Sequence, residues 1–160
     1  MRILICEDSE HNLQSAREFA EKVKGEHEVD IEATHPLRGL HGIKEGKYDL
    51  VLTDLFMKRT PDREIEPIGL FVALGALQHG LPVAIVTDGV SHSDEPAISF
   101  LENYCLEYNN ERLRVYFVDA DMHRPPESKY YSPHKGSAPG RKPIKDWEFC
   151  FHALMKAQPA

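Results

Sequence analysis

The chain has 160 residues, of which 41% are apolar and 28% are charged, and its 26 acidic and 19 basic residues give a formal net charge of −7. This length and balance are typical of one globular domain, and they exclude a disordered chain, a collagen and a coiled coil. The negative charge argues against a general nucleic-acid-binding protein, which needs a basic face. We therefore expect a single domain over residues 1–160 and do not expect a nucleic-acid partner.

Predicted strands and helices alternate along the chain. Ser9 is expected to be the N-cap of the first helix, and Gly25 is expected to end it. Apolar runs, period-two alternation and helical spacing of apolar residues predict, in chain order, Arg2–Cys6 as a strand, 13–23 as a helix, Glu28–Ala33 as a strand, Pro36–Lys44 as a helix, Tyr48–Thr53 as a strand, Gly69–Gln78 as a helix, Pro82–Val86 as a strand, Ala97–Tyr108 as a helix, Leu113–Val118 as a strand and Asp146–Lys156 as a helix. Such strand–helix units predict an α/β protein with a parallel sheet and helices on both faces.

The chain shows no segment typical of a membrane span or a secretory signal. The most apolar stretch, 68–86, is interrupted by polar residues and by Pro82, so we interpret it as a helix, a turn and a strand. Three cysteines occur at widely spaced positions, namely Cys6, Cys105 and Cys150. Their odd number and spacing match neither a disulfide framework nor a zinc site, and they indicate reduced thiols in the cytoplasm.

Polar residues follow four of the predicted strands. They are Glu7 and Asp8, then Asp54, then Thr87 and Asp88, and then Asp119. In parallel α/β sheets the functional crevice lies beyond the carboxyl ends of the strands. If the first and third strands are neighbours, the first three acids converge. Taken singly, each acid is equally well explained as a helix cap or a solvent-facing group.

A converging set of carboxylates has a chemical consequence. Three crowded carboxylates repel one another unless they share protons or hold a cation. Hard oxygen ligands on strand ends suit Mg²⁺, and no histidine or cysteine spacing favours zinc. A metal-bound carboxylate beside a hydroxyl such as that of Thr87 is a reasonable acceptor for a phosphoryl group.

Five segments stand out in chain order: Arg2–Asp8 (RILICED), Tyr48–Met57 (YDLVLTDLFM), Pro82–Thr87 (PVAIVT), Tyr116 in the fifth strand, and Lys142–Ile144 (KPI) before the last helix. In these segments and in their order, the chain resembles the receiver domain of two-component response regulators. The resemblance implies a flavodoxin-like (βα)₅ three-layer sandwich with the parallel strands in the order 2-1-3-4-5. It also implies a phosphoprotein of a phosphorelay, with output through contacts with a downstream protein target.

The resemblance implies an acceptor and a metal site. Asp54 would accept a phosphoryl group from a histidine kinase or a histidine phosphotransfer protein. Asp8, Asp54 and the backbone carbonyl of Phe56 would bind Mg²⁺, and Glu7 would act through water. The protein would be a phosphoacceptor, with possible autodephosphorylation, rather than an enzyme that turns over.

The resemblance also implies a switch. Thr87 would move to contact the phosphoryl oxygen, and Tyr116 would follow it inward. Lys142 would pair with the phosphoryl group. A local change of charge would thereby bias a two-state element.

Three features depart from the family pattern. Lys58–Ile68 is longer than the tight turn expected after the acceptor, and Asp88 stands where the family prefers a small residue. Asp119 stands at the strand position expected for the family's lysine, and the Lys-Pro pair appears only after an insertion at 120–141. Either Lys142 returns to the pocket or Asp119 stands at the site. A unit charge a few ångströms away is worth on the order of 4 kcal/mol at an intermediate dielectric, and we favour Lys142.

The second insertion is basic. Between Met122 and Lys145 there are six Lys or Arg residues and one acid. We expect both insertions to form a lid over the converging acids. For the basic insertion, a solvated loop is the equally weighted alternative. Two other functions stay open for the whole chain: a pseudo-receiver that binds partners without phosphorylation, and a Mg²⁺-dependent phosphohydrolase that uses the same acids.

Overall fold

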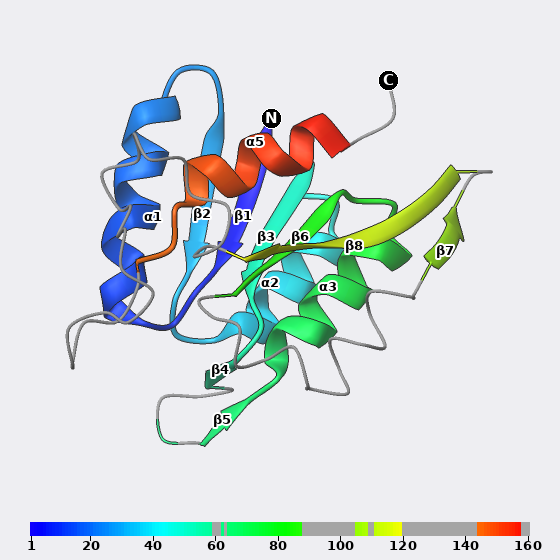
Figure 1. The fold of residues 1–160 in the computed structure, drawn as a ribbon. Helices are drawn as coiled ribbons and strands as arrows, with labels where there is room; N and C mark the ends of the chain where they lie inside the picture. The colour runs from blue at the N-terminus through cyan, green and yellow to red at the C-terminus, as the bar shows by residue number, and fades with distance from the viewer. Residues whose placement is uncertain (59–61, 63, 88–104, 109–110, 120–143, 158–160) are drawn as a thin grey trace.

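The computed structural model describes residues 1–58, 62, 64–87, 105–108, 111–119 and 144–157 (Figure 1). Its centre is a six-stranded sheet in the order β2-β1-β3-β6-β8-β7. The strands are β1 (Arg2–Cys6), β2 (Glu28–Glu32), β3 (Leu50–Asp54), β6 (Val83–Thr87), β7 (Cys105–Tyr108) and β8 (Glu111–Asp119). The first five in the sheet order are parallel, and β7 is antiparallel to β8. The predicted α/β architecture with a mostly parallel sheet is confirmed.

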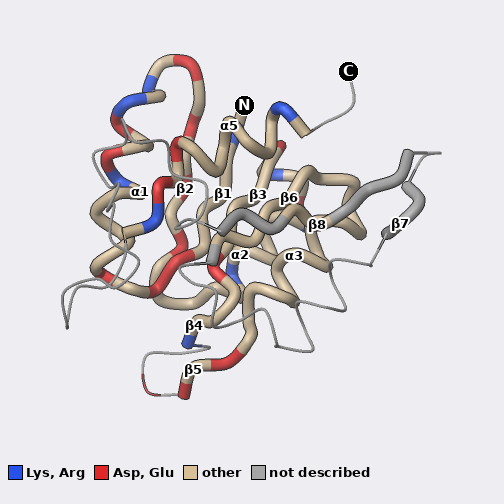
Figure 2. Tube along the Cα trace, viewed as in Figure 1, with Lys and Arg blue, Asp and Glu red and all other residues tan. Residues whose placement is uncertain are grey.

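Helices cover both faces of the sheet (Figure 1). They are α1 (Glu10–Val23), α2 (Pro36–Lys44), α3 (Ile68–Gln78) and α5 (Trp147–Ala157). Side chains alternate along the strands, so Ile3 and Ile5 pack with α1 and α5, whereas Leu4 and Cys6 pack with α2 and α3. Charged positions line α1 and are absent from α3 and β6 (Figure 2).

Local signals in the sequence set several helix ends. Gly25 follows α1 with a φ of 103°, a left-handed conformation that glycine adopts without strain. Pro36 stands in the first turn of α2, where its missing N–H costs nothing. Asp146 precedes α5, and its Oδ1 accepts a hydrogen bond from the backbone N–H of Phe149 at 3.0 Å. These residues fix where three of the helices begin or end.

One predicted helix is wrong at its carboxyl end. We expected Ala97–Tyr108 to be helical, but Cys105–Tyr108 is a strand whose last residue pairs with Glu111. Asn109 and Asn110 lie between the two strands in sequence, and asparagine favours two-residue hairpin connections. Over so few residues the apolar positions fit both the helical period and the strand period. Pairing with β8 makes this segment a strand. Residues 97–104 lie outside the described part of the chain.

The expected insertion after Asp54 contains a small hairpin. Strands β4 (Met57–Lys58) and β5 (Ile65–Glu66) pair antiparallel. Met57 is fully buried, which anchors the first strand of the hairpin in the core. The other expected insertion, 120–141, lies outside the described residues. Among the residues that the structure describes, no helix is long and apolar enough to cross a membrane.

Candidate functional site

Three acids, Glu7, Asp8 and Asp54, meet at the carboxyl edge of the sheet, and we call this part of the sheet the acidic edge. Glu7 and Asp8 follow β1, and Asp54 ends β3, the strand beside it. One carboxylate oxygen from each of the three residues lies within 4.8 Å of the others. The sequence-based expectation that these acids converge is therefore confirmed.

A buried lysine lies among these acids. The Lys145 side chain is 0% exposed, and its Nζ lies 2.8 Å from Glu7 Oε2 and 2.7 Å from Asp54 Oδ1. Lys145 lies two residues before the start of α5. The sequence analysis counted Lys145 as the last residue of a basic segment, and the structure leaves it in coil. For this residue the solvated alternative is wrong, because its ammonium is buried between two carboxylates.

The two residues that the sequence analysis weighed for the family's lysine position, Lys142 and Asp119, are less fully described. Lys142 lies outside the described residues. Asp119 ends β8, and its backbone pairs in register with Thr87 at the end of β6. The structure therefore supplies a cation by a route that neither of the two predicted alignments included.

Burial and charge act against each other in the acidic edge. Burial raises the pKa of Glu7 to about 7, Lys145 opposes this shift, and Asp54 adds to it. Burial lowers the pKa of Lys145, but the charges of Asp54 and Glu7 outweigh burial, and the pKa of Lys145 is raised. With all groups charged, three carboxylates and one ammonium leave −2. A divalent cation matches that charge.

Asp54 is oriented by its neighbours and still reaches the surface. Its Oδ1 accepts a hydrogen bond from the backbone N–H of Leu55 at 2.7 Å, and its side chain is 15% exposed. Gly69 lies against its backbone, since a Cβ built on Gly69 would stand 1.7 Å from the Asp54 carbonyl oxygen. Glu7, in contrast, is fully buried. Of these two carboxylates, Asp54 is the one that an incoming group can approach.

Asp8 connects the acidic edge to the insertion. Its Oδ2 accepts a hydrogen bond from the backbone N–H of Lys58 at 2.7 Å. Lys58 belongs to β4, so this hydrogen bond ties the first strand of the β4–β5 hairpin to Asp8, one of the three acids. Phe56 lies in the bend between Asp54 and this hairpin.

The predicted switch residues lie at different distances from the acids. Thr87 ends β6, one position beyond the residue that pairs with Asp54, so its backbone lies at the acidic edge. The Tyr116 hydroxyl donates a hydrogen bond to the Ala157 carbonyl at 2.7 Å, at the far end of α5. In this structure Tyr116 therefore contacts the helix rather than the acids. Asp88 lies outside the described residues.

The sequence analysis missed two polar residues of α1. Asn12 and Ser15 are 2% and 3% exposed, and both contact the backbone of Lys145. The apolar spacing that predicts this helix, which includes Leu13 and Ala16, does not include these two polar residues. Asn12 and Ser15 are three residues apart and share a helix face, but a polar pair beside an apolar stripe is equally typical of a solvent-facing side, so no local signal marks these two as buried.

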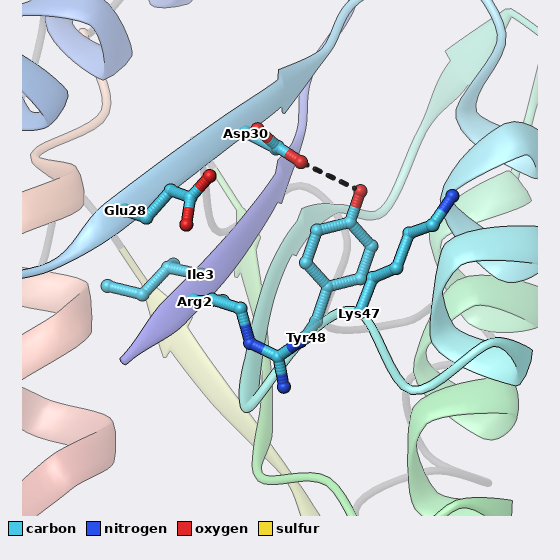
Figure 3. A pocket seen from close by; sticks show the side chains of 6 residues that line it. All are labelled: Arg2, Ile3, Glu28, Asp30, Lys47 and Tyr48. Atoms are coloured by element: carbon cyan, nitrogen blue, oxygen red, sulfur yellow. Dashed lines mark hydrogen bonds between the residues drawn. The ribbon is translucent and has the colours of Figure 1, made fainter.

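A cavity of 190 Å³ lies at the opposite, amino edge of the sheet (Figure 3). It is lined by Arg2, Ile3, Glu28, Asp30, Lys47 and Tyr48. The Tyr48 hydroxyl donates to Asp30 Oδ2 at 3.2 Å across it. Arg2 and Lys47 pair with Asp49 and Glu45, so the basic groups at this cavity are already neutralised.

Comparison with known proteins adds little. No family model and no curated protein matches the chain. A solved structure described as a yeast Spc42 trimeric coiled-coil segment fused to another structure is 26% identical, with a TM-score of 0.43, over 62% of this chain and 60% of that one. The match thus spans less than two thirds of that chain. We draw nothing about fold or function from a likeness of this strength.

Proposed function

We propose that this chain is a receiver-like signalling protein of the response-regulator type, in which Asp54 accepts a phosphoryl group in a Mg²⁺-dependent reaction. The observation that carries the proposal is the Lys145 ammonium held between Glu7 and Asp54 at the carboxyl edge of a parallel sheet. Phosphoryl transfer depends on positioned cations beside an oriented acceptor. The proposal takes residues 1–160 as one domain and assigns the observed sheet to the flavodoxin-like (βα)₅ class.

The acids fit a divalent metal. One oxygen from each lies within 4.8 Å of the others, and hard carboxylate oxygens suit Mg²⁺. Asp8 and Asp54 would hold the ion together with the backbone carbonyl of Phe56, and Glu7 would act through water, as the resemblance implies. When bound, Mg²⁺ would neutralise charge that develops on the phosphoryl oxygens.

The chain's own residues would then carry the transfer. An oxygen of the Asp54 carboxylate attacks phosphorus, the bond from phosphorus to the donor's histidine nitrogen breaks, and the electron pair stays on that nitrogen. The Leu55 N–H keeps the carboxylate oriented. Lys145 pairs with the new phosphoryl group, which is the role that the sequence analysis gave to Lys142. Thr87, at the next strand end, would contact a phosphoryl oxygen.

The proposal also names the partners. The donor would be a histidine kinase or a histidine phosphotransfer protein, and a downstream protein would receive the output, so the protein would act in the cytoplasm. If Tyr116 follows Thr87 inward, its hydroxyl must first leave the Ala157 carbonyl. That step would change the surface where β8 meets the end of α5.

A second candidate function has an observation of its own. Lys145 already bonds directly to two of the three acids, so the site is partly neutralised without any ligand. A pseudo-receiver that never takes a phosphoryl group would use the same lysine only to stabilise the fold. In the sequence, Asp88 and Asp119 follow the ends of two predicted strands and favour this alternative, because an anion beside the acceptor opposes phosphorylation.

Intact mass spectrometry after incubation with Mg²⁺ and acetyl phosphate tests the proposal. One labile phosphoryl adduct is expected on the wild type and on Asp49→Asn, a control at the opposite edge of the sheet, and none on Asp54→Asn. No adduct on the wild type, with Mg²⁺ binding shown separately, would support the pseudo-receiver. Continued release of phosphate over many turnovers would instead support the phosphohydrolase.

A further inference from the structure

Helix α1 holds the main chain of Lys145 from both sides. The Lys145 N–H donates to Asn12 Oδ1 at 3.1 Å. The Ser15 hydroxyl lies 2.7 Å from the Lys145 carbonyl and 2.9 Å from the Asn12 carbonyl, so its one proton is shared between the two, with the shorter distance to Lys145. The Trp147 indole N–H donates to the Asn12 carbonyl at 3.3 Å. Two side chains and one carbonyl of α1 thus contact the three-residue segment that carries the lysine.

This support matters because the lysine does not come from the sheet. Its side chain has a long flexible stem, so the position of its ammonium depends on where its backbone is held. Lys145 lies in the coil between the described end of β8 at Asp119 and the start of α5. No strand pairing of Lys145 is found in the described residues, and the hydrogen bonds from α1 take its place.

We propose that Asn12 and Ser15 are positioning residues of the site, which hold the Lys145 backbone so that its ammonium reaches both Glu7 and Asp54. The effect on phosphoryl transfer rests on the proposed function. The effect on the lysine itself does not, because it follows from the hydrogen bonds and from the burial of all the groups involved. A backbone N–H or carbonyl that loses a buried partner is strongly destabilised, so removal of either side chain should release the segment.

The same helix pair offers a matched control. Farther along the interface, the rings of Phe19 and Phe151 pack with their centroids 5.6 Å apart. Phe19→Leu loosens α1 against α5 without removing a hydrogen bond to Lys145. Ser15→Ala and Asn12→Leu remove one such hydrogen bond each, and Ser15→Thr keeps the hydroxyl.

The first readout does not depend on phosphorylation. Acetylation of lysines by brief exposure to acetic anhydride, mapped by peptide mass spectrometry, reports the accessibility of Lys145, with the exposed Lys47 as the internal reference. We expect Lys145 in Ser15→Ala and Asn12→Leu to react about tenfold faster than in the wild type, the factor expected when one buried hydrogen bond is lost. Ser15→Thr and Phe19→Leu should leave the Lys145 rate unchanged.

The second readout is the rate of phosphoryl labelling by acetyl phosphate. It should fall about tenfold in Ser15→Ala and Asn12→Leu and be restored in Ser15→Thr. An unchanged Lys145 acetylation rate in both variants, or an equal increase in Phe19→Leu, would overturn the positioning role. Faster acetylation without slower labelling would overturn its link to the reaction. Faster acetylation in a wild-type background that takes no label would uphold the positioning and reject the proposed function.

Discussion

A β-carbon on Gly69 would stand 1.7 Å from the carbonyl oxygen of Asp54, closer than two non-bonded heavy atoms can approach. The first turn of α3 therefore rests directly on the end of β3. The Gly69 N–H donates to the Leu55 carbonyl at 3.0 Å and completes this contact. The place of Asp54 is thus set by backbone packing, before any side chain of the site is considered.

The first prediction concerns this contact. Gly69→Ala should destabilise the protein by about 1–3 kcal/mol, since backbone cannot rotate away from the added methyl group. Gly75→Ala in the same helix is the control. Its methyl group would meet only the end of the Leu40 side chain, which can turn aside. Urea unfolding of both variants checks the prediction, and equal costs would contradict it.

The second prediction concerns the buried cation. Lys145→Met leaves Glu7 and Asp54 without their partner, and removal of one member of a buried pair costs about 3–5 kcal/mol. Denaturant unfolding at neutral pH should show this loss, whereas Lys47→Met at the exposed opposite edge should cost little. Adding Glu7→Gln to Lys145→Met should recover part of the loss. A Lys145→Met protein as stable as the wild type would show that the ammonium is not needed to balance these acids.

The third prediction concerns the hairpin. Asp8→Ala removes the acceptor of the Lys58 N–H, so β4 should open more often. Hydrogen exchange of the Lys58 amide, followed by NMR, should become about tenfold faster. Glu66→Ala, on the exposed side of β5, is the matched control and should change it little. If the two variants behave alike, Asp8 does not anchor the hairpin.

The fourth prediction concerns alkaline pH. Cys6 is fully buried, and burial raises the pKa of its thiol above the ordinary value of 9.0. Above pH 9.0 the unfolded chain loses the thiol proton, whereas the folded protein keeps it. The contribution of Cys6 to the free energy of unfolding is therefore fully present below pH 9.0 and is lost as the pH rises above it. The free energy of unfolding should fall by up to about 1.4 kcal/mol per pH unit from this group.

The Cys6 contribution can be isolated by difference. Cys6→Ala should show a shallower decline than the wild type between pH 9 and pH 10, measured by urea unfolding at each pH. Burial and the Asp30 carboxylate also raise the pKa of Tyr48 to about 12, and Cys6 adds a smaller contribution, so most of the Tyr48 titration is common to both proteins. If the free energy of unfolding falls equally with pH in the two proteins, the Cys6 thiol does not cause the decline.

The acids could be predicted from sequence because each follows a strand whose burial is a local property. An apolar run that stops at Glu7 or at Asp54 predicts both the strand and the polar residue at its end. Adjacent parallel strands then bring such ends together without further information. Convergence of the acidic edge is thus a consequence of short-range patterns.

Lys145 could not be predicted in the same way. The groups that hold its backbone, Asn12 and Ser15, lie 133 and 130 residues away in the chain. Several lysines and arginines precede α5, and no local pattern distinguishes the one that folds inward. The strand β7 was missed for a related reason, since its assignment depends on pairing with β8 rather than on its own periodicity.

The hydrogen bond between Lys145 and Glu7 joins residues 138 positions apart, and this separation has a consequence during synthesis. As the chain leaves the ribosome, β1 and β3 can pair long before the segment with Lys145 exists. The acids then depend on free cations from solution for compensation. Closing such a long loop is entropically costly and slow, so this contact should be among the last to form. A nascent chain stalled before α5 would therefore hold a sheet whose carboxyl edge carries acids without their lysine partner.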